Sequence, residues 1–74
     1  MNLSIELRDS NGTHLKLGDV IELFDWGGKQ ESIGRATLCW DADEGRISTE
    51  PRLVEDPHDF WRKAMPRCKL VKRH

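Results

Sequence analysis

The 74-residue chain carries 12 Lys and Arg against 13 Asp and Glu, and its formal charge of −1 argues against the strongly basic class of nucleic-acid-binding proteins. This length makes a single small domain, 1–74, whose core is too small to surround a deep catalytic cleft. No apolar run approaches the roughly 20 residues that span a bilayer, and the first residues lack a secretory signal pattern. We therefore expect a cytoplasmic protein that does not contact a membrane.

The N-terminal part of the chain is predicted to form strands separated by turns. Residues 2–8 alternate apolar with polar side chains, as a strand with one face in water does. Residues 9–12 contain the Asn-Gly pair that favours a tight turn. Leu15 and Leu17 continue the apolar face, and Val20–Phe24 is rich in residues that favour strands.

A β-hairpin over residues 34–50 is predicted after a glycine-containing loop at 25–32. Three apolar side chains share one face of its first strand, 34–41: Ala36, Leu38 and Trp40. We predict that Trp40 crosses the core of the domain. Gly45 is suited to close the acidic hairpin loop because glycine adopts positive φ without strain.

A short helix is predicted before the last strand. Asp56 is a suitable N-cap and Pro57 a suitable first helical residue, while Pro66 is expected to end the helix after about two turns. Phe60 and Trp61 are adjacent, so their side chains diverge by about 100° around the helix. One of them is expected to enter the core and the other to be partly exposed or to cover the open end of a barrel.

The order of these elements predicts a mainly β fold. We expect a small SH3-like barrel of four to five antiparallel strands with one short helix before the last strand, 68–71. The alternative is an open antiparallel sheet with the helix packed on it. Residues 72–74 are expected to be frayed. An exposed edge strand would allow pairing with a second copy, so we expect a monomer or a weak homodimer.

Candidate chemical groups are few. Cys39 and Cys68 form no CxxC motif, and whether they form a disulfide is left open. The His residues match no compact zinc site, so we expect no metal and no cofactor: His14, His58 and His74. No His lies near Cys39 in sequence to activate it, and Gly27-Gly28-Lys29 lacks the phosphate-loop frame. We expect that the chain is not an enzyme.

Several short motifs follow one another in a recognisable order: Asp9-Ser10-Asn11-Gly12, Leu17-Gly18-Asp19-Val20-Ile21, Gly34-Arg35-Ala36, Cys39-Trp40-Asp41 and Glu44-Gly45-Arg46-Ile47. This order resembles the YopX family of small β-barrel proteins from bacteriophages and prophages. Ile47 stands where that family often has an aromatic residue, and the terminal motif of the family is absent. The resemblance implies a mobile-element protein in the cytoplasm of a bacterial host and supplies no enzymatic activity.

The first functional hypothesis is a phage- or prophage-type binding protein that acts through protein–protein interaction, as an inhibitor or modulator of a host factor. Its surface would join the loop of Trp26 and Lys29, the acidic hairpin tip and the segment 60–67. The expected contact residues are Trp26, Lys29, Asp41, Asp43, Glu44, Trp61, Arg62, Lys63 and Arg67. For Trp26, the alternative is that it folds back and caps the barrel.

The second hypothesis is a small barrel that binds single- or double-stranded nucleic acid and is accessory to phage replication or regulation. Small barrels bind single strands with stacking aromatic side chains and a basic groove. Here Trp26 and Trp61 would stack on bases. The residues expected to meet phosphates are Lys29, Arg62, Lys63, Arg67, Lys69 and Lys72.

Overall fold

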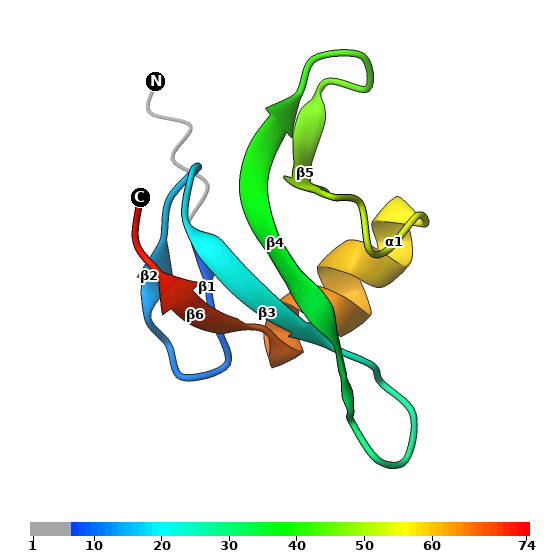
Figure 1. Ribbon diagram of the computed structural model, residues 1–74. Helices are drawn as coiled ribbons and strands as arrows, with labels where there is room; N and C mark the ends of the chain where they lie inside the picture. Colours follow the sequence, from blue (N-terminus) through cyan, green and yellow to red (C-terminus); the bar gives the residue numbers. More distant parts are fainter. Residues whose placement is uncertain (1–6) are drawn as a thin grey trace.

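The computed structural model describes residues 7–74, which form two antiparallel sheets and one short helical segment (Figure 1). The strands are β1 (Leu7–Arg8), β2 (His14–Leu15), β3 (Val20–Phe24), β4 (Ser32–Asp41), β5 (Arg46–Glu50) and β6 (Lys69–Lys72). β1 and β2 form a hairpin, and the other four strands form a sheet in the order β5-β4-β3-β6. The fold is therefore mainly β, as predicted. The strand pairing among the described residues does not close a barrel.

β4 is the central strand, and its two halves have different neighbours. β3 pairs with the first half of β4, from Phe24 opposite Ser32 to Val20 opposite Thr37. β5 pairs with the second half, from Glu50 opposite Thr37 to Arg46 opposite Asp41. The β4–β5 hairpin therefore extends past the β3 pairing and ends in an isolated tip (Figure 1).

The prediction that Trp40 fills the core is wrong. Leu38 is buried, but Trp40, two residues further along the same face, is 55% exposed. The turn before β3 still bonds to the Leu38 backbone, with the Gly18 amide 2.8 Å from the Leu38 carbonyl oxygen. No described strand pairs with β4 on the β3 side beyond this point, so Trp40 lies on a part of β4 that has lost its neighbour on that side.

The core lies between the four-stranded sheet and the helical segment, which is behind the sheet in Figure 1. The buried core residues are Leu7, Leu15, Ile21, Leu23, Leu38, Ile47, Phe60, Ala64, Met65 and Cys68. Leu17, which was predicted to continue the apolar face, is exposed instead. Cys39 and Cys68, whose pairing was left open, are both free thiols.

The helical segment begins as predicted and ends differently. Asp56 caps α1 (Pro57–Asp59), with its Oδ1 accepting a hydrogen bond of 2.8 Å from the His58 amide. A π-helical turn, Phe60–Ala64, and a 3₁₀ turn, Met65–Arg67, follow. Pro66 does not end the segment, because a proline in the first turn of a new 3₁₀ helix needs no amide donor.

One glycine inside β4 has a clear packing role. Strand β4 begins at Ser32, two residues earlier than predicted, and Gly34 lies within it opposite Leu23, where the register shifts. Its φ of 131° is strained for any other residue, and a Cβ at this position would lie 3.3 Å from Cδ1 of Leu53. Gly34 thus lets the chain after β5 approach the sheet closely.

Two buried carboxylates connect the turns of the N-terminal region to residues 70–74. The Asp9 carboxylate accepts hydrogen bonds from the amides of Asn11 and Thr13, both at 2.9 Å, and from the amide of Leu70 at 3.0 Å. Burial alone would raise the pKa of Asp9. The three amides favour the charged form, and the net effect is a pKa below the ordinary value.

The Asp19 carboxylate makes the second of these connections. It accepts hydrogen bonds from the amides of Lys16 at 2.9 Å and His74 at 3.0 Å, and Arg73 lies 3.8 Å away. Burial opposes its ionisation, but these amides and the Arg73 charge outweigh burial and lower the pKa of Asp19. The prediction that residues 72–74 fray is wrong, because the amide of His74 is bound and Lys72 belongs to β6.

The predicted strand over residues 2–8 lies largely outside the described residues, which begin at Leu7.

The edge strand β5 is well covered, since Ile47, Ser48 and Thr49 are all buried. Such coverage protects a sheet edge from pairing with other chains.

Candidate functional site

The three tryptophans occupy three different environments. Trp40 is at the hairpin tip and largely in solvent, Trp61 on the helical segment is 36% exposed, and Trp26 is half-buried against the core. Phe60 is buried while Trp61 is exposed, as the sequence predicted for this adjacent pair. Exposed aromatic side chains of this size are characteristic of contact surfaces.

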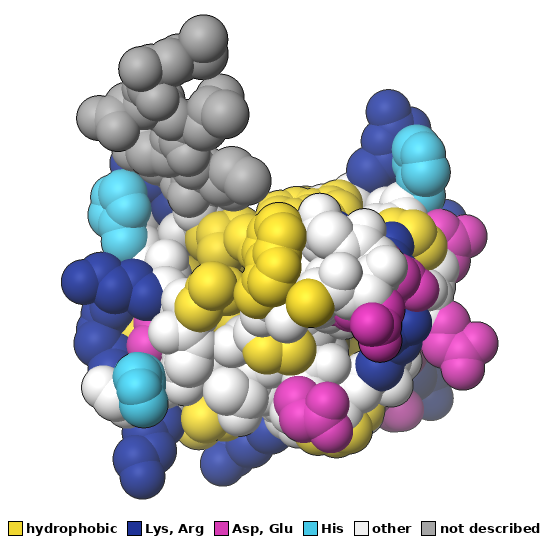
Figure 2. Space-filling model, turned by 90° about the horizontal axis from the view of Figure 1, so that it is seen from above, with side chains coloured by type: hydrophobic (Ala, Val, Ile, Leu, Met, Phe, Trp, Pro, Cys, Tyr) yellow, Lys and Arg dark blue, Asp and Glu magenta, His cyan; other side chains and the backbone are white. Residues whose placement is uncertain are grey.

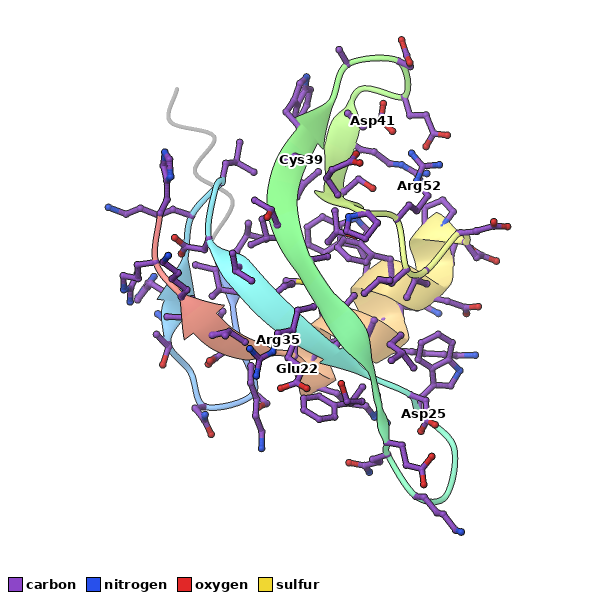
Figure 3. The ribbon with its side chains drawn as sticks, viewed as in Figure 1. Glu22, Asp25, Arg35, Cys39, Asp41 and Arg52 are labelled. Carbon is purple, nitrogen blue, oxygen red and sulfur yellow. The ribbon has the colours of Figure 1, made fainter. Side chains whose placement is uncertain are left out.

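The first candidate surface is the hairpin-tip surface, formed by residues 40–44. Asp41 organises its turn, because Oδ1 accepts hydrogen bonds from the amides of Asp43 at 3.0 Å and Glu44 at 3.2 Å. Gly45, with φ of 66°, closes the loop as predicted. Figure 3 shows the side chains of Asp41 and Arg52 pointing toward one another, and Arg52 forms an ion pair with Asp41.

The acidic charge of this tip is largely balanced by arginines of the same chain. Arg46 pairs with Glu44, and Arg52 bridges Asp41 and Glu44, the latter at 3.4 Å. Asp43 has no ion-pair partner among residues 7–74. Viewed from the hairpin end, Figure 2 shows hydrophobic side chains gathered near the centre of this face and acidic side chains toward its margin. The net negative charge of the tip is therefore smaller than its sequence indicates.

The second candidate is the helical surface, formed by Trp26 and the exposed residues of 60–67. The Lys63 ammonium lies 5.7 Å from the centre of the Trp26 ring and 3.3 Å from Oδ1 of Asp59. Arg67 donates a hydrogen bond of 2.8 Å to the Lys63 carbonyl. Trp26 has folded back against the core, and Lys63 covers its outer face.

Trp61 stands between two hollows of the helical surface. One hollow, of about 260 Å³, is lined by Leu7, Arg8, Trp61, Met65 and Pro66. The other, of about 240 Å³, is lined by Pro57, His58, Trp61 and Arg62. Trp61 thus contributes to both hollows, and each of them is also lined by an arginine, Arg8 in the first and Arg62 in the second.

The nine expected contact residues fall into two groups. Trp26, Trp61, Arg62, Lys63 and Arg67 come together on the helical surface, and Lys29 lies in the nearby β3–β4 loop. Asp41, Asp43 and Glu44 lie at the hairpin tip, at the other end of β4 (Figure 1). Strand β4 spans roughly 30 Å at about 3.3 Å per residue, so the loop with Lys29 that precedes it lies far from the hairpin tip, and the nine residues do not form one compact surface.

Sequence reasoning missed Trp40 as an exposed residue, although a signal was present. The predicted strand at Val20–Phe24 is shorter than its neighbour at 34–41. Because a longer strand must extend past a shorter partner, its terminal side chains lose their cover. Sequence reasoning also missed Asp9 and Asp19, which were treated only as turn residues.

Cys39 is a half-buried free thiol and Cys68 a buried one. Burial, and then the negative charge of Asp9, raise the pKa of Cys68 to about 11, so its thiol stays protonated. Within the described part of the chain, no three His, Cys, Asp or Glu side chains are arranged to hold a metal ion. Over the same residues, no helix is long and apolar enough to cross a bilayer.

Comparison with known proteins gives no relative: no protein-family model, no curated protein and no solved structure matches this chain.

Proposed function

We propose that this chain is a small binding protein that docks on another protein through the helical surface, with Trp61 as the central contact. It acts by binding rather than by catalysis, as an inhibitor or modulator of a host factor. The observation that carries the proposal is the exposure of Trp61 beside a core that is already filled by other side chains. A 74-residue chain has few large apolar side chains, and leaving one in water loses the free energy of its burial.

The shape and charge around Trp61 support this choice over the hairpin tip. The ring is flanked by depressions that accept apolar side chains of a partner, and Arg62 at the rim adds orientation through its charge. At the hairpin tip, by contrast, the carboxylates of Asp41 and Glu44 are engaged by arginines of the same chain. A partner of the tip would have to displace these arginines.

Capture from a bacterial lysate tests the proposal with matched tryptophan variants. The wild-type chain, Trp61→Ala and Trp40→Ala are immobilised, and circular dichroism first establishes that all three are folded. We expect at least one protein that wild type and Trp40→Ala retain and that Trp61→Ala retains at least about tenfold less. Titration of that purified protein against each variant then checks direct binding.

Two outcomes would overturn this assignment. If wild type retains nothing above the empty matrix, protein binding is not its function. If only Trp40→Ala loses the captured protein, the contact lies at the hairpin tip and not on the helical surface.

A second candidate function is nucleic-acid binding, accessory to phage replication or regulation. It is favoured by the position of Lys63 and Arg67 beside Trp26, with Trp61 and Arg62 on the same segment. Aromatic and basic side chains in this combination bind single strands. Fluorescence anisotropy with labelled single- and double-stranded DNA and RNA tests it. Binding that weakens steeply with salt supports it, and no binding at low salt rejects it.

For fold and origin, we propose an SH3-like barrel of the YopX-like phage and prophage type, acting in the cytoplasm of a bacterial host. The antiparallel β3–β4–β5 meander, followed by a helical segment and a last strand on β3, supports the barrel. The turn motifs at residues 9–12 and 17–21 support the family. An experimental structure that includes the first six residues would test whether the barrel closes.

A further inference from the structure

A separate hollow lies at the end of the molecule where β3 leads into the β3–β4 loop. It has a volume of about 310 Å³ and is lined by Ser10, Phe24, Gln30, Pro66, Arg67 and Lys69. These residues come from the β1–β2 turn, the end of β3, the loop after it, the 3₁₀ turn and the start of β6. We call it the Phe24 hollow. Trp61, the central contact of the protein-binding proposal, does not line it, whereas Arg67 belongs both to this hollow and to the helical surface.

The lining of the Phe24 hollow combines positive charge with an aromatic ring. The Lys69 ammonium lies 5.4 Å from the centre of the Phe24 ring. Arg67 is held in place by its hydrogen bond to the Lys63 carbonyl, which uses only part of its donor capacity. No carboxylate lines this hollow. Its two cations therefore face one small space without an anion between them.

Glu22 is the acidic group closest in register, and it does not cancel this charge. It lies opposite Lys69 on β3, but no ion pair joins the two within 4.0 Å. One Glu22 oxygen accepts a hydrogen bond of 2.7 Å from the Ser32 hydroxyl. On the other side Glu22 faces Arg35, and Figure 3 shows these two side chains next to one another. Lys69 is thus available to an external anion.

We propose that the Phe24 hollow binds a nucleotide, with its phosphate between Lys69 and Arg67 and its base against the Phe24 ring. A phosphate fits two cations that have no carboxylate partner, and a planar base fits the face of an aromatic ring, here that of the half-buried Phe24. The long Lys69 side chain exchanges its contact with the ring for one with the phosphate. The volume is at the lower end of the range for small-ligand pockets, which suits a single nucleotide unit.

A nucleotide can reach this hollow as a free molecule or as part of a single-stranded nucleic acid. One titration distinguishes these two possibilities. The ¹⁵N-labelled chain is titrated with AMP, adenosine, inorganic phosphate and a short oligoadenylate, and amide shifts are followed by NMR. We expect AMP to shift amides around Phe24, Arg67 and Lys69 with a Kd of about 1 mM or tighter. Adenosine and phosphate alone should each bind about tenfold more weakly. Tighter binding of the oligoadenylate identifies a strand as the ligand, and equal or weaker binding identifies the free nucleotide.

Matched variants test which residues hold the ligand. Lys69→Gln and Arg67→Gln should each weaken AMP binding about tenfold, since each removes a charge-assisted hydrogen bond. Lys16→Gln removes a like charge at an exposed position outside the lining, so its effect should stay below about twofold. Phe24→Leu should reduce the affinity for AMP to that for phosphate.

Three results would overturn the nucleotide site. One is the absence of shifts near the hollow at about 10 mM AMP. Another is an equal loss of affinity in Lys16→Gln and Lys69→Gln, which would mean that only overall charge matters. The third is inorganic phosphate binding as tightly as AMP, because the ring would then contribute nothing.

Discussion

Two ends of this molecule use the same chemistry with different results. At the β1–β2 turn, Asp9 accepts amide hydrogen bonds from Asn11 and Thr13, and at the hairpin tip Asp41 accepts them from Asp43 and Glu44. Both aspartates shape a turn. Only Asp9 is also buried and bound to a distant strand, through the amide of Leu70. The remaining oxygen of Asp41 is bound by Arg52 near the surface.

The difference shows that a turn motif does not by itself determine how much a carboxylate contributes to stability. Removing the acceptor at a buried position leaves amides without a partner and without water, and each such donor is costly. Removing it at the tip leaves amides that water can reach. The two regions should therefore respond very differently to the same substitution.

The largest effect is expected from Asp9→Ala. The change removes the acceptor of three amides, and we expect the free energy of unfolding to fall by about 3 kcal/mol. Urea denaturation followed by circular dichroism measures it. Asp43→Ala, at the tip, is the matched control and should change stability by less than about 0.5 kcal/mol. A loss below about 1 kcal/mol for Asp9→Ala would mean that the two turns are equivalent.

Thiol labelling should report the same contrast without denaturant. Cys68 is buried and its carbonyl accepts a hydrogen bond of 2.8 Å from the Ser10 amide, next to Asp9. Since labelling requires opening of this region, Asp9→Ala should speed the reaction of Cys68 about 100-fold. Asp41→Ala should change it by less than about fivefold. Measurement in a Cys39→Ser background assigns the signal. If Asp9→Ala and Asp41→Ala accelerate the labelling of Cys68 equally, the expected difference between the buried and the exposed turn is wrong.

Protonation of Asp9 and Asp19 at low pH should lower the free energy of unfolding less than substitution of these residues does. The pKa values of Asp9 and Asp19 are lowered in the folded chain from an ordinary value of 3.8, so the unfolded chain binds protons more readily. Their contribution is present above pH 3.8 and is lost as pH falls through the folded-state pKa values. The double variant Asp9→Asn/Asp19→Asn should show a flatter dependence of unfolding free energy on pH. An unchanged slope would show that other groups dominate acid unfolding.

A much smaller effect than that of Asp9→Ala is expected from Asp41→Ala. Its ion pair with Arg52 is near the surface, and its turn amides remain accessible to water. We expect a loss of about 0.5–1 kcal/mol at low ionic strength. About 1 M NaCl should narrow the difference from wild type, since salt screens exposed pairs. Urea denaturation at both salt concentrations measures the loss of unfolding free energy. If Asp41→Ala loses more than Asp9→Ala, the exposed turn contributes more to stability than the buried one, opposite to our expectation.

Local features of the fold were predictable from the sequence. The positive φ at Gly45, the Asp56 cap and the division of Phe60 and Trp61 between core and solvent all depend on neighbouring residues. The exposure of Trp40 was not predictable in this way. Alternation assigns a side chain to a face, but the length of the next strand decides whether that face is covered.

The partners of the charged side chains could not be predicted from the sequence either. The sequence shows an acidic run at residues 41–44, and it does not show that Arg52 folds back over it. The partners of Asp9 and Asp19 are 61 and 55 residues away, at Leu70 and His74. Such contacts have no periodic signal. The candidate surfaces could therefore be predicted only in part. The sequence gives the sign of each charge, but it does not give the residue that neutralises it.

The hydrogen bonds that Asp9 accepts from Leu70 and Asp19 accepts from His74 also affect when the chain can fold in the cell. Both acceptors are made early in translation, and both donors leave the ribosome only at the end of this stretch. Until then the early carboxylates lack their distant amides, so we expect cooperative folding to wait until residues 70–74 have emerged. A nascent chain stalled before Leu70 emerges should remain sensitive to protease.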